Sequence, residues 1–207
     1  MVEGNLIGTG KNARKPLPND GDGVFITGSK GHLIGGTFSG QGNVIAFNGG
    51  SGIGAITVVL SGSSLVPSGD RFTNNSIFRN GGLGIDRGGD GLTPNDPVPD
   101  PDSGPNGLQN FPRIASAAQT ATNTVVRGSL ASKRSTSFEI QLFATPAGDA
   151  EGKTVLSTFT VASGNDGKVS FTRNLPSLPV GTLITATATD LGRLQTSELS
   201  PGRPVTP

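Results

Sequence analysis

Two copies of one short motif, spaced at a fixed interval, constrain the fold of this chain more than any other feature. The copies are Gly42-Asn43-Val44-Ile45, Asn48, Gly50-Ser51-Gly52-Ile53 and Asn74-Asn75-Ser76-Ile77, Asn80, Gly82-Leu83-Gly84-Ile85. Equivalent residues such as Asn43 and Asn75 are 75 − 43 = 32 residues apart, and neither copy contains a gap. Self-similarity at a period of this length is typical of a stacked, solenoid-like backbone.

Weaker copies of the motif extend the pattern toward the N-terminus. They lie at Gly4-Asn5-Leu6-Ile7, Gly21-Asp22-Gly23-Val24 and Gly31-His32-Leu33-Ile34. Stacked coils place equivalent side chains above one another, so the pattern predicts an interior apolar column and a corner ladder of asparagines. The predicted column is Ile7, Ile34, Ile45 and Ile77, and the predicted ladder is Asn5, Asn43 and Asn75. The alternative is a set of Gly/Asn hairpin turns in an antiparallel sandwich, but hairpins rarely repeat one motif in gap-free register.

Residues 4–92, with these motifs in this order, resemble the right-handed parallel β-helix repeats of large bacterial secreted or cell-surface proteins. The resemblance implies an extracellular or cell-surface location, although residues 1–5 show no signal peptide, so a fragment of a longer protein is expected. The sequence departs from the family pattern at His32, where the family usually has Asn. His32 is the only histidine, and a hydrogen-bonding role at a coil corner is predicted for it rather than catalysis.

The pattern changes after about residue 113 to an alternation with a period of two. In Phe138-Glu139-Ile140-Gln141-Leu142 the apolar residues share one face, and similar runs follow at 155–161, 169–171 and 184–189. Asn165-Asp166-Gly167 predicts a hairpin turn. Six or seven short strands at this spacing favour an immunoglobulin-like β-sandwich. Residues 184–190 and 196–200 also resemble the ends of Ig-like modules that follow such β-helices.

The predicted fold class is therefore all-β, a short right-handed parallel β-helix followed by an antiparallel Ig-like sandwich. The predicted domains are 1–92 for the repeats, 93–112 for an Asp/Pro/Gly-rich linker and 113–207 for the sandwich. The 33 glycines and 15 prolines argue against long amphipathic helices.

The junction contains five aspartates in a short span. They are Asp86, Asp90, Asp96, Asp100 and Asp102. Hard cations such as Ca²⁺ prefer oxygen ligands of this kind, so a calcium site is one hypothesis. The spacing does not match an EF-hand, and a solvated acidic turn is the alternative.

Composition narrows the classes of partner. A net charge of +1 gives no indication of nucleic-acid binding. The longest apolar run, 55–60, is too short to cross a bilayer, so no membrane insertion is expected. Cysteine is absent, which excludes disulfides and thiolate chemistry. Trp and Tyr are absent, which weakens a sugar-binding interpretation because sugars usually stack on aromatic rings, although phenylalanines could supply some stacking.

The expected role is a non-catalytic structural, adhesive or carbohydrate-directed module, with a polysaccharide or cell-surface ligand as partner. The alternative is a polysaccharide lyase or hydrolase built on the repeats. Its candidate catalytic residues are Asp70, Arg71, Asp86, Arg87 and Asp90. A truncated stack leaves Leu6 and Ile7 uncovered, so a homodimer through that end is also predicted.

Overall fold

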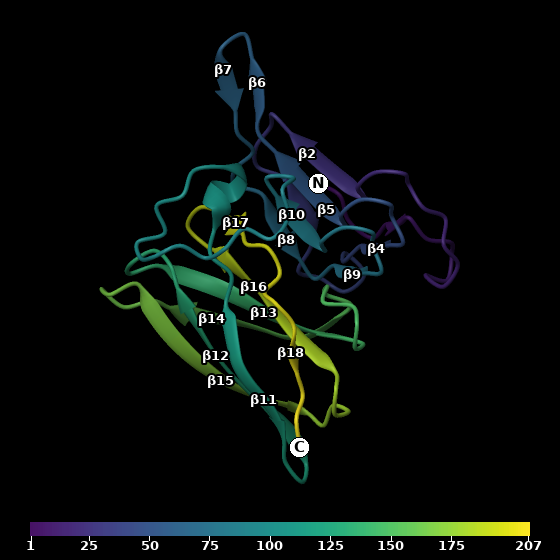
Figure 1. Ribbon diagram of the computed structural model, residues 1–207, viewed down its shortest axis with the longest axis vertical. Helices are drawn as coiled ribbons and strands as arrows, with labels where there is room; N and C mark the ends of the chain where they lie inside the picture. The colour runs from purple at the N-terminus through teal and green to yellow at the C-terminus, as the bar shows by residue number, and fades with distance from the viewer.

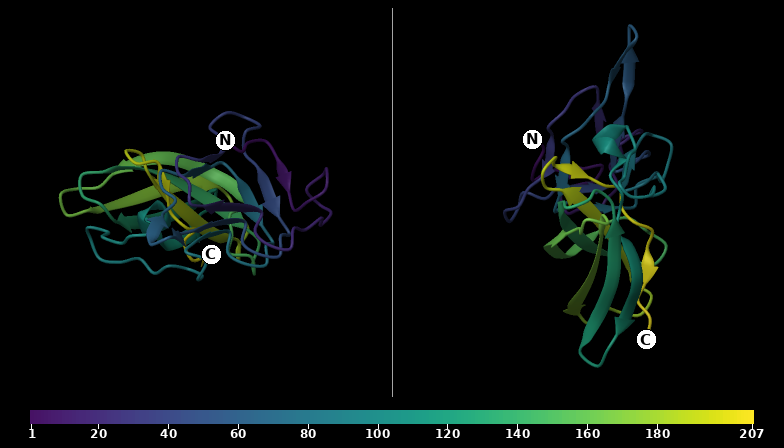
Figure 2. Two further views of the ribbon diagram at one scale, coloured as in Figure 1. Left: turned by 90° about the horizontal axis from the view of Figure 1, so that it is seen from above. Right: turned by 90° about the vertical axis from the view of Figure 1, so that its left-hand side faces the viewer.

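The computed structural model describes all residues 1–207 and shows an all-β chain, as predicted. The single exception is a short 3₁₀ segment, η1 (Pro105–Leu108). Figure 1 shows two halves stacked along the long axis, an N-terminal half of short parallel strands and a C-terminal half of longer antiparallel strands. The right-hand view of Figure 2 places the two chain ends in different halves. None of the structure's helical segments has the length and hydrophobicity to cross a membrane.

Short strands that pair in parallel build the N-terminal half, called here the parallel half. One stack holds β1 (Leu6–Ile7), β4 (Val44–Ala46) and β9 (Ser76–Phe78), a second holds β2 (Val24–Thr27), β5 (Ile53–Ile56) and β10 (Ile85–Arg87), and a third holds β3 (Leu33–Gly35) and β8 (Arg71–Thr73). A parallel bridge from Val2 to Ile34 extends the third stack. The three stacks thus share three successive layers, and β8, β9 and β10 form the last.

The predicted isoleucine column exists with one member misplaced. Ile7 pairs with Ile45 and Ile45 with Ile77, in register along β1, β4 and β9. The prediction for Ile34 is wrong, because Ile34 pairs with Phe72 in the third stack. Ile34 is still buried in the same apolar core, which it reaches from a different side. The 31–34 segment resembles the motif in sequence but occupies another side of each layer.

Close packing requires glycine at two positions that directly precede strands of the second stack, Gly23 before β2 and Gly52 before β5. A Cβ placed on Gly23 would lie 2.5 Å from Cγ2 of Ile45, and one on Gly52 would lie 2.5 Å from Cγ2 of Ile77. Real Cβ atoms do not approach carbon this closely, so a larger residue would push the isoleucine column out of place. The Gly-x-Gly pairs of the motif therefore keep the stacks close together around the core.

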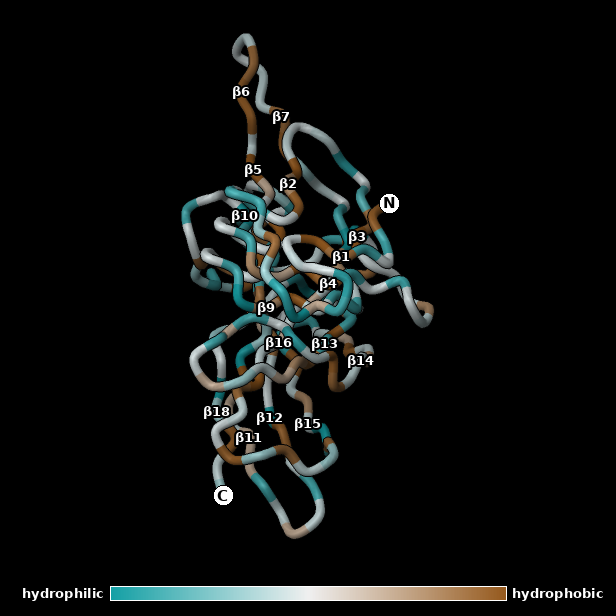
Figure 3. Tube along the Cα trace, turned by 90° about the vertical axis from the view of Figure 1, so that its right-hand side faces the viewer, coloured by the Kyte–Doolittle hydropathy of each residue, from teal (hydrophilic) through white to brown (hydrophobic).

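A hairpin projects from the parallel half at its far end from the antiparallel half (Figure 1). It consists of β6 (Val58–Leu60) and β7 (Ser63–Leu65), which pair antiparallel. Val59 and Leu60 are exposed on it, and Figure 3 shows β6 in the brown of hydrophobic residues.

Two antiparallel sheets form the C-terminal half, called here the antiparallel half. One sheet has the order β11 (Arg113–Gln119), β12 (Asn123–Ala131), β15 (Lys168–Pro176), and the other has β14 (Thr154–Ala162), β13 (Ser137–Thr145), β16 (Leu183–Asp190), β17 (Gln195–Thr196), with β18 (Arg203–Pro204) also on β16. Both sheets contribute to one apolar core, for example Val126 and Leu130 from one and Ile140 and Ile184 from the other. The two sheets therefore pack face to face.

The predicted hairpin at Asn165-Asp166-Gly167 is wrong in its pairing. The turn joins β14 to β15, but β14 pairs with β13 and β15 pairs with β12. The chain crosses here from one sheet to the other. The turn itself is present. Strand partners depend on which faces must be buried, and the turn residues do not encode this choice.

The two halves share apolar contacts. Phe143 on β13 and Leu199 after β17 belong to the same buried cluster as Ile45 and Ile77. A Cβ on Gly84 in the last parallel layer would lie 2.5 Å from Cδ1 of Leu199. Side chains of the antiparallel half thus cover the core of the parallel half on the side of its last layer.

Candidate functional site

Polar side chains connect the last parallel layer to the antiparallel half. Within the parallel half, layers are linked by asparagine side chains: the amide N and Nδ2 of Asn43 both donate to Oδ1 of Asn75, at 3.1 and 2.9 Å. Asn5 donates to Oδ1 of Asn43 in the same way, at 3.0 and 3.1 Å. The predicted asparagine ladder is therefore confirmed. Each layer donates to the side chain of the next.

A second ladder, not predicted, ends on a carboxylate of the antiparallel half. Asn48 donates its amide N and Nδ2 to Oδ1 of Asn80, at 3.1 and 2.9 Å. Asn80 in turn donates its amide N to Oε1 of Glu151 at 3.0 Å and its Nδ2 to Oε2 at 2.9 Å. Glu151 therefore occupies the chemical position that an asparagine of a further layer would occupy.

The third stack has the same kind of hydrogen-bonded ladder between layers, built from different residues. His32 donates its amide N to Oδ1 of Asp70 at 2.9 Å, and Asp70 donates its amide N to Oδ1 of Asn106 at 2.9 Å. Nδ1 of His32 also lies 2.7 Å from the same Asp70 oxygen. The predicted hydrogen-bonding role of His32 agrees with these contacts. Asn106 belongs to the junction, so here the junction segment ends the ladder.

Main-chain groups of the last layer find partners in the antiparallel half as well. Ile77 donates its amide to the carbonyl of Gly152 at 2.9 Å and accepts from the amide of Gly152 at 3.0 Å. Phe72 donates its amide to Oγ1 of Thr196 at 2.9 Å. Asn74 and Gln141 exchange two bonds, amide N to Oε1 at 3.1 Å and Nε2 to Oδ1 at 2.7 Å. The edge of the last layer is thereby satisfied without another parallel strand.

At β10, the edge of the last layer is hydrogen-bonded to Glu198, which lies beside a fully buried arginine. Glu198 accepts from the amide of Arg87 at 2.8 Å and from the amide of Thr93 at 2.9 Å. Arg87 is 1% exposed, and its Nη2 donates to the carbonyl of Gln109 at 2.8 Å. Burial lowers the pKa of Arg87 to about 10, against the opposing charge of Glu198. Burial also raises the pKa of Glu198, which Arg87 partly offsets.

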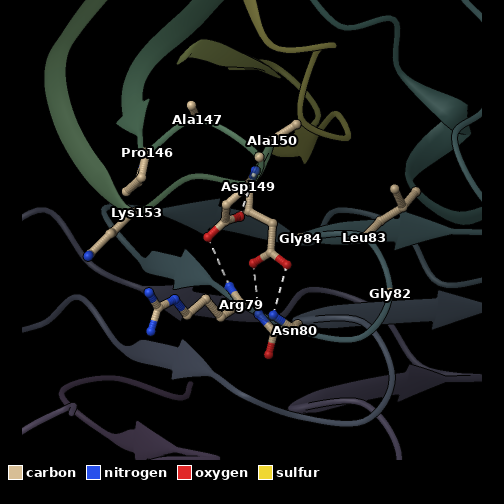
Figure 4. Close-up of a pocket in the computed structure, with 12 residues that line it drawn as sticks. Arg79, Asn80, Gly82, Leu83, Gly84, Pro146, Ala147, Asp149, Ala150 and Lys153 are labelled. Atoms are coloured by element: carbon tan, nitrogen blue, oxygen red, sulfur yellow. Dashed lines mark hydrogen bonds between the residues drawn. The ribbon is translucent and has the colours of Figure 1, made fainter. Parts of the chain in front are cut away.

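A cavity of about 450 Å³ opens between the last parallel layer and residues 146–153 (Figure 4). Arg79 and Lys153 bring positive charge to it, and Asp149 and Glu151 bring negative charge. Asp149 accepts from the amide of Arg79 at 3.1 Å. Burial raises the pKa of Glu151 to about 7, with the hydrogen bond from Asn80 opposing the rise. Both Glu151 oxygens accept from Asn80, so this carboxylate is a hydrogen-bond acceptor that links the two halves.

The five residues predicted as catalytic candidates are dispersed over the last layer. Asp70 is 1% exposed and bonded to His32, and Arg71 pairs through Nη2 with Glu139 at 2.8 Å. Asp86 accepts from the amides of Gly89 and Gly91 in its own turn. Arg87 is buried as described, and Asp90 is exposed on the surface. None of the five lines the cavity at Glu151.

The five aspartates proposed as calcium ligands also have different surroundings. No group of three or more His, Cys, Asp or Glu side chains lies close enough together to hold a metal ion. Asp86 and Asp90 lie in the turn after β10, whereas Asp96, Asp100 and Asp102 lie further along the junction. Burial, and then the charges of Asp102 and Asp100, raise the pKa of Asp96, and burial raises the pKa of Asp100.

The residues that join the two halves were not identified from the sequence. They are Glu139, Gln141, Glu151, Thr196 and Glu198. One signal was available for the first two, because the apolar face of 138–142 leaves them together on the opposite face of β13. That face covers the last parallel layer, and Gln141 is only 1% exposed. Glu151 and Glu198 carry no comparable local pattern. No protein-family model and no curated protein matches this sequence.

Proposed function

We propose that this chain is a non-catalytic module of a larger secreted or cell-surface protein, in which an immunoglobulin-like β-sandwich closes the end of a right-handed parallel β-helix. Three layers of parallel strands, two face-to-face antiparallel sheets and the sequence resemblance support the proposal. Its role in the parent protein is structural and adhesive, with a polysaccharide or another cell-surface ligand as partner.

The single observation that carries the proposal is the end of the ladder at Glu151. The last layer of a parallel stack exposes unpaired amides and an open apolar core, a surface on which other chains can add as strands. Glu151 accepts the hydrogen bonds of Asn80, and Gly152 pairs with the main chain of Ile77. Phe143 and Leu199 cover the core. The antiparallel half therefore supplies what a further layer would supply, without leaving an open edge of its own there.

A test of the closing role compares the interface with a matched position elsewhere. Glu151→Ala removes both acceptors of Asn80, and Thr160→Ala, on an exposed position of β14, is the control. We expect faster hydrogen exchange at Asn80 and Ile77 in Glu151→Ala and unchanged exchange in Thr160→Ala. Unchanged exchange at both amides in Glu151→Ala would remove the basis of the proposal.

The role itself is tested by a glycan array together with a polysaccharide-turnover screen, each run with and without calcium. We expect binding without cleavage. Cleavage products that disappear in Asp86→Ala or Asp90→Ala would instead establish the polysaccharide-active enzyme. The homodimer through Leu6, which is 44% exposed at the opposite end of the stack, stays a prediction that light scattering checks.

A further inference from the structure

An open groove of about 510 Å³ lies on the outer face of the stack of β1, β4 and β9. Val44 and Ser76 line it. The residues that follow them, Ile45 and Ile77, are buried in the core on the other side of the stack. The loop after β1 and residues 153–154 border the groove. Segments that are far apart in the sequence therefore build one continuous surface.

The charged residues of this groove are all cations. They are Arg14, Arg79 and Lys153. No ion pair within 4.0 Å joins any of them to a carboxylate. Arg14 and Arg79 are exposed, and Lys153 is half-buried. Three cations and no carboxylate give the lining a formal charge of +3, which attracts an anionic ligand.

The groove adjoins the cavity at Glu151, because Arg79 and Lys153 line both. Asp149 and Glu151 line the cavity only, where they balance the two cations. Figure 4 shows the charged ends of Arg79 and Lys153 at one end of the cavity, away from Leu83. Both volumes lie in the range of about 300–1,000 Å³ that is usual for ligand sites. An extended ligand can therefore place anionic groups in the groove and uncharged hydroxyl groups in the cavity.

Two phenylalanine rings give the groove an apolar part. Phe47 packs edge-on against Phe78 with ring centroids 5.6 Å apart, and Nζ of Lys153 lies 4.9 Å from the Phe78 centroid. Phe47 and Arg79 occupy equivalent corners of successive layers, 79 − 47 = 32 residues apart, with φ of 65° and 54°. A phenylalanine and an arginine are strained in this left-handed conformation, which glycine and asparagine adopt more easily. Strained residues of this kind cluster at ligand-binding sites.

We propose that this groove binds an acidic polysaccharide through the carboxylate or sulfate groups of the sugar chain. The inference rests on the proposed function and names the class of its ligand. Arg14 and Arg79 can each donate two parallel hydrogen bonds to such a group, and Lys153 adds a compact positive charge. Phe47 offers an apolar contact to the carbon face of a sugar ring.

Two other kinds of anionic partner fit the groove less well. A peptide that adds as a strand needs an open sheet edge, but β4 already pairs with β1 and β9 on its two sides. A nucleic acid needs free stacking rings and a broad basic surface. Here Lys153 lies over the Phe78 ring, and the chain carries a net charge of only +1. A sugar chain is bound by side chains alone, which are what this groove presents.

The test is isothermal titration calorimetry of the full chain with an oligoglucuronate, in EGTA so that no calcium bridges the carboxylates. The methyl ester of the same oligosaccharide lacks the charges and is the matched control ligand. We expect the oligoglucuronate to bind, with an affinity that falls as salt rises, and the ester to give no measurable heat. Dextran sulfate, compared with dextran, distinguishes recognition of sulfate from recognition of carboxylate, and binding of either acidic glycan supports the proposal.

Removal of single charges locates the site. Arg14→Gln, Arg79→Gln and Lys153→Gln should each lower the affinity about three- to tenfold, because each removes one charged hydrogen-bond donor. Arg79→Lys should recover part of the loss, since it keeps the charge without the planar fork. Arg134→Gln, at an exposed position outside the groove, is the control and should leave the affinity unchanged. The exposed positions of Arg14 and Arg79 keep the test valid should Lys153→Gln fail to fold.

Four outcomes would overturn the proposal. They are equal affinity for the methyl ester, tighter binding of polyglutamate or single-stranded DNA than of either acidic glycan, full affinity in both Arg14→Gln and Arg79→Gln, and no heat with either acidic glycan. Each of them leaves the hydrogen exchange at Asn80 and Ile77 unaffected. Because that exchange tests the closing role of the antiparallel half, the two proposals can fail separately.

Discussion

The parallel and antiparallel halves obtain their stability in different ways. Strands of the parallel half are two to four residues long, and side-chain ladders such as Asn5–Asn43–Asn75 link the layers at their corners. Strands of the antiparallel half reach nine residues and pair through long main-chain ladders, as β12 does with β15. The antiparallel half has its own core, whereas the core of the parallel half includes Phe143 and Leu199 of the other half. The parallel half thus depends on its neighbour for closure more than the reverse.

The largest expected effect comes from the column at the centre of the parallel half. Ile45 is fully buried between Ile7 and Ile77, so Ile45→Ala should lower the free energy of unfolding by about 2–5 kcal/mol. Hydrogen exchange should increase in the parallel half while β12 and β15 stay protected. Ile140→Ala, equally buried in the antiparallel core, is the comparison and should weaken both halves. Identical exchange maps for the two variants would refute the dependence of one half on the other.

The next effect concerns pH at the contact between the halves. The pKa of Glu151 is about 7 in the folded protein against 4.5 as its ordinary value, so the folded state binds the proton more tightly. The associated stability is fully present below about pH 4.5 and is lost as the pH rises through about 7, which amounts to at most about 3 kcal/mol.

Urea unfolding at about pH 5 and about pH 8 measures this difference. Glu151→Gln cannot titrate, so its stability should vary less between the two pH values than that of the parent chain. Subtracting the pH dependence of Glu151→Gln from that of the parent chain also removes the contributions of Asp96, Asp100 and Glu198. The raised pKa values of these groups act in the same direction. An unchanged pH dependence in Glu151→Gln would show that the carboxylate is not the titrating group.

A corner asparagine should matter more than an asparagine on a long strand. Asn43→Ala removes the acceptor of Asn5 and the side-chain donor to Asn75, and it leaves buried polar groups unpaired. We expect a loss of about 2 kcal/mol in urea unfolding. Asn174→Ala, at an exposed position of β15, should change stability by less than about 0.5 kcal/mol. Equal losses would mean that the ladder contributes nothing beyond ordinary surface contacts.

The smallest effect is expected at the ion pair that joins the halves. Arg71 and Glu139 pair through two contacts at 2.8 and 3.0 Å, with side chains 22% and 13% exposed. Arg71→Ala should cost about 1 kcal/mol at low salt and less at high salt. Arg203→Ala, exposed on β18, is the control and should cost nothing measurable. A salt-independent loss would assign the effect to packing of the arginine stem.

Local repetition explains which parts of this fold were predictable. The 32-residue interval places Asn43 over Asn75 and Ile45 over Ile77, because equivalent positions of stacked layers coincide. Ile34 was placed in the wrong stack, since a short motif does not say which side of a layer it occupies. The partner of β15 was missed for a related reason: turn residues determine a reversal of the chain, whereas pairing depends on the whole core.

The contacts between the halves could not be read from the sequence at all. Glu151 lies 151 − 80 = 71 residues from Asn80, and no local periodicity marks it. Its role depends on the last parallel layer being directly adjacent to residues 146–153. The catalytic and calcium candidates were chosen by residue type, and no three of their carboxylates lie close enough together to hold a metal ion. A dense acidic composition identifies a region but cannot tell a turn-forming carboxylate such as Asp86 from an unpartnered one.

The direction of the asparagine ladder gives the two ends of the parallel half different chemistry. In the Asn48–Asn80 ladder the amide N and Nδ2 of one layer donate to the side chain of the next, so Asn80 of the last layer presents donors that must meet oxygen atoms. Length and termination are therefore separable: adding or deleting one whole layer before the last would leave the contacts of Glu151 as they are. Evolution or protein engineering can therefore change the number of layers and keep the same closing contacts at Glu151.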